Sequence, residues 1–241
     1  VMSGHITTGG WVPVGNATIT AGTASKRSAC ADGAYELIVP PGEVEVKVSA
    51  PGYAELVQTV AVPEEGLTKD FDLTPHTQDL ASTATVTASS FLETPFESFP
   101  PASAADRDSC NYWEAAGLLD HGSEWLQFDW ESPVTVDTVK IVDGGAASPV
   151  TVEVWKDEAW LLVAMDEAPE FPLALQFAPV ETTKLRINRL WKAYEVESRN
   201  DLGPVQAPNV TGTGTNSLTG QPVVQARVTV GDVSCYTSAA G

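Results

Sequence analysis

The chain has 241 residues and a mass of 25.5 kDa, which is enough for one large domain or two smaller ones. Hydrophobic residues make up 43% and charged residues 19%, an ordinary globular composition. With 13 Lys and Arg residues against 32 Asp and Glu residues, the net charge is −19. A surface this acidic repels phosphate backbones and anionic lipids, which disfavours nucleic acid and membrane surfaces as partners. No apolar run is long enough to span a membrane, so no membrane insertion is expected.

Motifs that usually mark catalysis are missing from the sequence. There is no nucleophile elbow, phosphate-binding loop or dinucleotide fingerprint, and the histidines lack the spacing of a metal-ligand pair. Glycoside hydrolysis by two carboxylates would need one acid desolvated by an apolar motif, and no acid has such neighbours in the sequence. We therefore expect no enzymatic activity.

Residues 1–75 have the pattern of short β-strands. Residues 43–48 alternate strictly between polar and apolar side chains, which is typical of a strand with one buried face. Other strand-like runs, separated by turns rich in glycine and proline, cover residues 17–20, 34–39, 56–62 and 69–73. Short runs with such regular turns predict a small β-sandwich.

Five motifs in this segment follow one another in a recognisable order. They occupy residues 3–6, 13–19, 31–37, 40–42 and 50–53. The series resembles the carboxypeptidase regulatory-like domain, and the resemblance covers nearly all of residues 1–75. It implies a transthyretin-like, seven-stranded β-sandwich that serves as a non-catalytic spacer or interaction module.

Residues 76–204 are also rich in strand patterns, and helix signals are nearly missing. Strand-like runs cover residues 124–130, 134–142, 150–155, 160–164, 173–177, 184–188 and 193–198. These runs, together with residues 84–90, 105–108 and 111–113, resemble in their order a discoidin (coagulation-factor C-type) domain. The resemblance covers about residues 80–200 and implies an eight-stranded, galactose-binding-like jelly-roll.

The C-terminal segment repeats part of the N-terminal one. Pro222 and Ala226 match Pro13 and Ala17, in both cases 209 positions later in the chain. We therefore expect a second carboxypeptidase regulatory-like domain that starts near Val210 and stops after two or three strands, with open strand edges. Either the chain is a fragment of a longer protein, or another polypeptide completes this half-domain through residues 210–241.

The resemblance to discoidin domains also implies a structural calcium ion held by a loop in the middle segment. Calcium takes six to eight oxygen ligands, and Asp106, Asp108 and Asn111 supply such oxygens within six residues. Glu195 matches the carboxylate that, in the family, returns to this site from the last strand. The alternative is a solvated acidic loop in which Arg107 pairs with Asp108.

Carbohydrate recognition is the second candidate function, and it needs an exposed aromatic ring with polar side chains that bond to hydroxyl groups. The best such cluster is Trp191, expected in the loop before the final strand, with Arg189 and Asn188 beside it. His121 and Trp160 are weaker additions. The alternative is that these tryptophans are core or edge residues. That role is expected for Trp113, Trp125 and Trp130.

The three cysteines are too few and too scattered for a disulfide scaffold or a zinc site. Cys30 and Cys235 occupy near-equivalent positions in the two repeats. Each is either a small buried hydrophobe or a disulfide partner in an exported protein. For Cys110 we expect a small buried thiol.

Together these features predict an all-β, non-enzymatic protein that is secreted or held at the cell surface. A transthyretin-like β-sandwich at residues 1–75 leads into a discoidin-like jelly-roll at 76–204 and a partial second sandwich at 205–241. The main hypothesis is a structural or adhesive module of a larger surface protein or fibre, which assembles with other copies or neighbouring domains by strand complementation. The alternative is a carbohydrate-binding module that anchors a larger protein to glycans.

Overall fold

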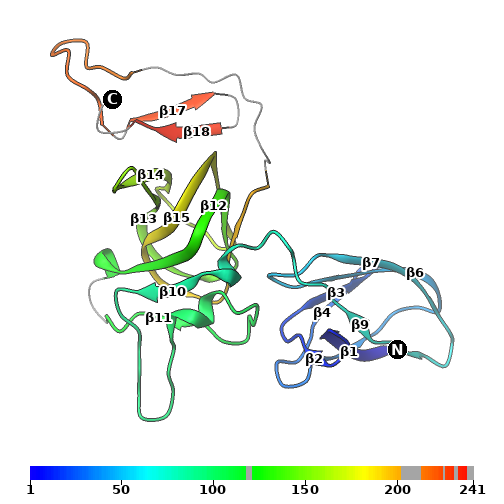
Figure 1. Cartoon of the computed structure of the whole chain (residues 1–241). Helices are drawn as coiled ribbons and strands as arrows, with labels where there is room; N and C mark the ends of the chain where they lie inside the picture. The colour runs from blue at the N-terminus through cyan, green and yellow to red at the C-terminus, as the bar shows by residue number, and fades with distance from the viewer. Residues whose placement is uncertain (118–120, 202–212, 225, 231–232, 238–241) are drawn as a thin grey trace. The chain divides into compact units, whose positions relative to one another are not determined.

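The regular secondary structure of the described residues is almost entirely β-strand (Figure 1). The computed structural model describes residues 1–117, 121–201, 213–224, 226–230 and 233–237. These residues contain short 3₁₀ helices and no α-helix, which confirms the predicted all-β class, and none of their helices is long and apolar enough to cross a membrane. The chain divides into unit 1, which contains Val1–Thr77 and Asp106–Asn111, and unit 2, which contains Gln78–Ala105 and Tyr112–Gly241.

Unit 1 contains two sheets. One has the strand order β4-β3-β6-β7, and the other has the order β2-β1-β5, with β8 and β9 also paired to β1. The strands are β1 (Met2–Thr8), β2 (Val12–Pro13), β3 (Thr18–Ala21), β4 (Ala24–Arg27), β5 (Ala34–Leu37), β6 (Gly42–Ser49), β7 (Leu56–Val62), β8 (Leu67–Thr68) and β9 (Phe71–Asp72). In β6 the alternation places Val46 and Val48 in the core at 0% exposure, while Glu45 and Lys47 face solvent.

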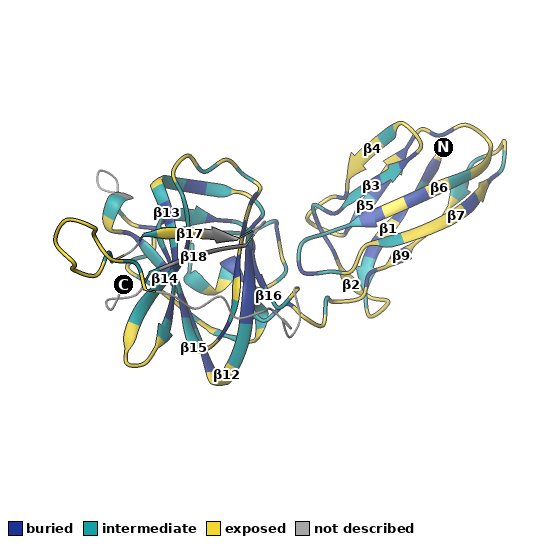
Figure 2. Ribbon diagram, turned by 90° about the horizontal axis from the view of Figure 1, so that it is seen from above, coloured by how far each residue is buried: buried dark blue, intermediate teal, exposed yellow. Residues whose placement is uncertain are grey.

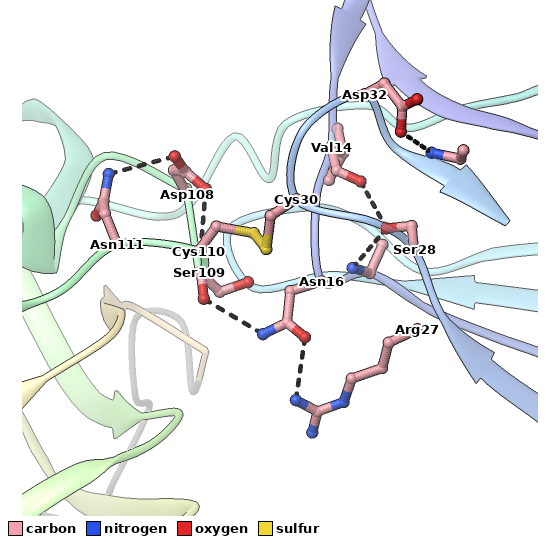
Figure 3. Close-up of a disulfide and its surroundings, with 12 residues drawn as sticks. Val14, Asn16, Arg27, Ser28, Cys30, Asp32, Asp108, Ser109, Cys110 and Asn111 are labelled. Carbon is pink, nitrogen blue, oxygen red and sulfur yellow. Dashed lines mark hydrogen bonds between the residues drawn. A yellow bond between two sulfur atoms is a disulfide. The ribbon is translucent and has the colours of Figure 1, made fainter.

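A short segment from the middle of the sequence, Asp106–Asn111, belongs to unit 1. Cys110 in this segment forms a disulfide with Cys30, 80 residues away (Figure 3). Gly15 lies against the bond, because a Cβ at this position would come within 2.6 Å of Cys110 Sγ. The expectation that Cys110 is a buried thiol is therefore wrong. The pairing depends on the fold bringing a distant segment to Cys30, and spacing along the sequence does not reveal it.

Unit 2 is built on a seven-stranded sheet with the order β10-β12-β15-β13-β14, in which β11 also pairs with β15 and β16 with β12. Its strands are β10 (Thr85–Ala88), β11 (Trp113–Glu114), β12 (Trp125–Ile141), β13 (Gly144–Lys156), β14 (Ala159–Asp166), β15 (Leu173–Ala193) and β16 (Val196–Arg199). Its 3₁₀ helices are η1 (Ala81–Thr83), η2 (Pro101–Ala104) and η3 (His121–Ser123).

Two long strands, β12 and β15, dominate unit 2 with 17 and 21 residues. Each joins two runs that the sequence predicts as separate strands, and register shifts interrupt their pairing between Asp129 and Val134 and between Val136 and Thr138. Such bulges bend a strand without ending it, so the same strand continues along the core. Figure 2 shows buried positions distributed along both strands. The fully buried residues of this core include Trp113, as expected.

The described part of the tail forms an antiparallel hairpin of β17 (Arg227–Val230) and β18 (Val233–Tyr236), and β18 lies against β14 and β15. Both strands begin and end 209 positions after β3 and β4, and the two hairpins have the same register throughout. Cys235 therefore corresponds to Lys26, and the expected equivalence with Cys30 is wrong.

The two hairpins also share a hydrogen-bonding device. The Ser28 hydroxyl accepts a bond from Ala17 N at 3.0 Å and donates to Val14 O at 2.8 Å. Thr237, again 209 positions later, uses its hydroxyl in the same way with the corresponding alanine and valine of the tail. The repeat thus extends from sequence to backbone pairing, while a second, incomplete domain at residues 205–241 stays a prediction.

Candidate functional site

Three of the four predicted calcium ligands lie together in the segment that belongs to unit 1. Asn111 Nδ2 donates to Asp106 Oδ2 at 3.0 Å. It also donates to Asp108 Oδ2 at 3.2 Å (Figure 3). The remaining carboxylate oxygens accept backbone N–H groups, from Asp108 N to Asp106 Oδ1 and from Cys110 N to Asp108 Oδ1. Partial burial raises the pKa of Asp106, although its side chain reaches solvent. The loop is therefore closed by its own hydrogen bonds.

The fourth predicted ligand, Glu195, lies in unit 2 between β15 and β16 and is 0% exposed. Its backbone carbonyl accepts a bond from Val142 N at 2.9 Å. Within the described residues, no group of three or more acidic, histidine or cysteine side chains could hold a metal ion. The loop supplies oxygen donors of the kind calcium needs, but only two of them are carboxylates, and calcium binding stays a prediction.

Trp191 lies within strand β15 and not in the loop expected for it. Its indole packs on the backbone of Gly145 in β13, where an added Cβ would come within 2.3 Å of the ring. The ring is partly buried and packs against the core of unit 2. The predicted loop position of Trp191 is wrong because β15 continues through these residues.

Arg189 lies at an irregularity of β15 with a positive φ of 65°. Its side chain donates from Nε to Gly122 O at 3.3 Å and from Nη1 to Ser148 O at 2.7 Å. These bonds tie η3 and β13 to β15. His121, the other predicted sugar-binding residue, begins η3, and its side chain lies outside the described residues.

Asn188, the next predicted residue, contacts polar groups on the opposite side of the sheet from the core. Its Nδ2 donates to Glu153 Oε2 at 2.9 Å and to Thr151 Oγ1 at 3.1 Å. Trp125 is the register partner of Asn188 on strand β12. The structure therefore separates the predicted sugar-binding residues, with Asn188 on this side of the sheet and Trp191 against the core.

Beside Asn188, the same side of the sheet carries a stack of aromatic and cationic groups. The guanidinium carbon of Arg186 lies 4.5 Å from the ring centroid of Trp125 and 4.3 Å from that of Trp160. Arg186 also donates from Nε and Nη2 to Gln127 Oε1, at 3.0 and 2.6 Å. We call the polar face of unit 2 the set Trp125, Gln127, Glu153, Trp160, Arg186 and Asn188. All six side chains are partly exposed, even with β18 against β14 and β15.

The polar face combines what is needed to bind a polar, uncharged molecule. It contains two indole rings, amide groups that both donate and accept, and one cation and one anion, Arg186 and Glu153, whose formal charges balance. The cation–π contacts and hydrogen bonds fix these side chains before any ligand arrives, which lowers the entropy lost on binding. Rigid aromatic surfaces next to such groups are suited to sugar rings and their hydroxyls.

The sequence predicts Trp125 among the core or edge tryptophans, and no motif in it singles out Arg186 or Glu153. The alternation of side chains along the strand does indicate the position of Trp125. It lies two residues before Gln127, and the intervening Leu126 is 0% exposed. Because alternate residues of a strand face opposite sides, Trp125 shares its side with polar residues.

No protein-family model matches the chain, and no curated protein sequence matches it. Among solved structures, chitosan-binding module 1 of a chitosanase/glucanase from Paenibacillus sp. IK-5 is 24% identical, with a TM-score of 0.44, and the alignment covers 52% of this chain and 100% of the module. Module 2 of the same enzyme, in complex with chitotriose, is 17% identical over 50% of this chain and 99% of the module, with a TM-score of 0.44. The family 32 carbohydrate-binding module of Clostridium perfringens NanJ, in complex with galactose, is 16% identical over 51% of this chain and 98% of the module, with a TM-score of 0.43. Similarity at this level of identity concerns the fold alone.

Proposed function

We propose that the protein is a non-catalytic, extracellular module that binds carbohydrate through the polar face of unit 2. The observation that carries the proposal is the stack in which Arg186 lies between Trp125 and Trp160, beside amide and carboxylate groups. The disulfide between Cys30 and Cys110 supports an oxidising compartment, such as the extracellular space.

The experiment is a screen of the full chain against immobilised glycans, followed by calorimetric titration of each sugar that binds. Replacing Trp160 by alanine should weaken binding by up to about tenfold, since an aromatic contact contributes about 0.5–1.5 kcal/mol beyond area burial and 1.4 kcal/mol corresponds to a factor of ten. The matched control is Trp11→Ala, because Trp11 is 80% exposed and belongs to unit 1. Equal affinity of both variants, each with an unchanged melting temperature, would place binding elsewhere.

The repeated hairpin favours a second function, as a length-building structural or adhesive module. Strands β17 and β18 reproduce the bounds and register of β3 and β4, which is typical of proteins that reuse one module along the chain. In this function, residues 210–241 would contact other copies or neighbouring domains. Light scattering over a wide concentration range tests the contact between copies, and a strictly monomeric chain at all concentrations would exclude it.

A further inference from the structure

We propose that the polar face of unit 2 binds an extended, uncharged glycan chain, lying across the strands, and not a single terminal sugar. This inference rests on the proposed carbohydrate-binding function and specifies its ligand. It depends on three properties of the face: the direction of its aromatic stack, the mixture of donors and acceptors along it, and its charge balance.

The aromatic stack runs across the strands. Trp125 is on β12, Arg186 on β15 and Trp160 on β14, and β13 lies between the last two strands. Trp155 of β13 continues the stack, with its ring centroid 5.4 Å from that of Trp160 in an edge-to-face arrangement. Because Arg186 contacts both rings, the Trp125 and Trp160 centroids lie at most about 9 Å apart. A stack of this length exceeds a single six-membered sugar ring and suits linked rings.

Hydrogen-bonding groups accompany this stack on more than one strand. Gln127 lies on β12, Asn188 on β15 and Glu153 on β13, so a glycan crossing the strands would meet a polar group at each step. Arg186 donates its hydrogen bonds from Nε and Nη2, and among the described residues Nη1 has no protein acceptor and remains for a hydroxyl group. Hydroxyl groups both donate and accept, which is the chemistry that such a mixed set recognises.

The charges on the face select against ionised sugars. Arg186 is balanced by Glu153, and Lys184 nearby pairs with Asp129 at 3.4 Å. A charged ligand of either sign is therefore repelled by one of these groups while it is attracted by another. The net charge of −19 on the whole chain additionally repels polyanionic glycans at long range. A neutral chain is the ligand that avoids both penalties.

The test is calorimetric titration of the full chain with cello-oligosaccharides and N-acetylchito-oligosaccharides of one to six units, at physiological and at high salt. Affinity should rise about tenfold between one and three units and change little with salt. Trp160→Ala should abolish the rise, and Arg186→Lys should reduce it, because lysine keeps the charge but loses the planar group between the rings. Phe96→Ala is the control within unit 2, since Phe96 is 94% exposed and lies outside the polar face.

The outcomes separate this inference from the function on which it rests. A single sugar that binds as tightly as the hexamer would overturn the extended-chain ligand and leave carbohydrate binding intact. Binding that disappears at high salt would overturn the inference that the ligand is uncharged. If no glycan of any length binds, the proposed function itself fails.

Discussion

Removing the disulfide between Cys30 and Cys110 should destabilise unit 1 by several kcal/mol. The bond joins residues 80 positions apart, so it restricts a long loop of the unfolded chain. For a closed loop of this length, the chain-entropy relation gives about 4.5 kcal/mol at 25 °C. Relaxation of the variant and residual structure in its unfolded state reduce the effect, and measured losses are typically about 2–4 kcal/mol. We expect a loss in that range.

The assay is equilibrium urea unfolding of the full chain, followed by circular dichroism, for the parent and for the double variant Cys30→Ser, Cys110→Ser. The double variant should have a lower midpoint and a steeper dependence on urea, because an uncrosslinked chain exposes more surface on unfolding. Cys235→Ser is the control, since it removes a cysteine and leaves the bond in place. A double variant with the parent's midpoint, when a non-reducing gel shows the bond in the parent, would refute the reasoning.

Three further predictions concern unit 1. Gly15→Ala should lower its stability by about 1–3 kcal/mol in the same urea assay, because the new Cβ would meet the disulfide sulfur at 2.6 Å; an unchanged midpoint would contradict this packing. Tyr35→Phe should cost about 1 kcal/mol, since the buried hydroxyl donates to Lys69 O at 2.6 Å, and thermal melting that matches the parent would exclude that contribution. Calcium should raise the melting temperature relative to a chelator, and Asp106→Asn should weaken this effect. Burial raises the pKa of Asp106, and the ionised form that binds a cation prevails above that pKa, so the calcium effect should fade on acidification at a higher pH than for an ordinary aspartate. Equal melting in calcium and chelator at neutral pH would remove the calcium site.

Strand phase is the property of this fold that the sequence predicts best. In β6 the alternation of residues 43–48 predicts which side chains are buried, because a sheet with one buried face imposes a period of two. The strand ends of unit 2 are predicted less well. Pro133 and Pro179 fall in the gaps between predicted strand runs, yet they lie within β12 and β15, next to shifts in register. A proline is tolerated in a strand at a bulge, where no ladder hydrogen bond is needed from it.

The candidate site shows what the alternation of side chains along a strand cannot predict. Phase places Trp125 on the polar side of β12, but its neighbour Arg186 comes from β15 and its counterpart Trp160 from β14. Their meeting depends on the strand order β12-β15-β13-β14, in which neighbours are distant in sequence. The pairing of Cys30 with Cys110 is hidden for the same reason. The sequence pattern thus predicts which side chains of one strand are buried. To predict a site assembled from several strands, the order of the strands in the sheet must also be known.

The repeated hairpin indicates which local features the fold of this module requires. Between the two copies most side chains differ, and Thr18 of β3 is replaced by Arg227 in β17. Among the features kept is a hydroxyl, Ser28 or Thr237, that accepts from one backbone N–H and donates to one backbone carbonyl. Both backbone groups lie before the hairpin, where no ladder partner satisfies them, and a buried backbone group without a partner is costly. Replacing Ser28 by alanine would leave both groups without this partner, so the hydroxyl is a local feature that stabilises the start of both hairpins.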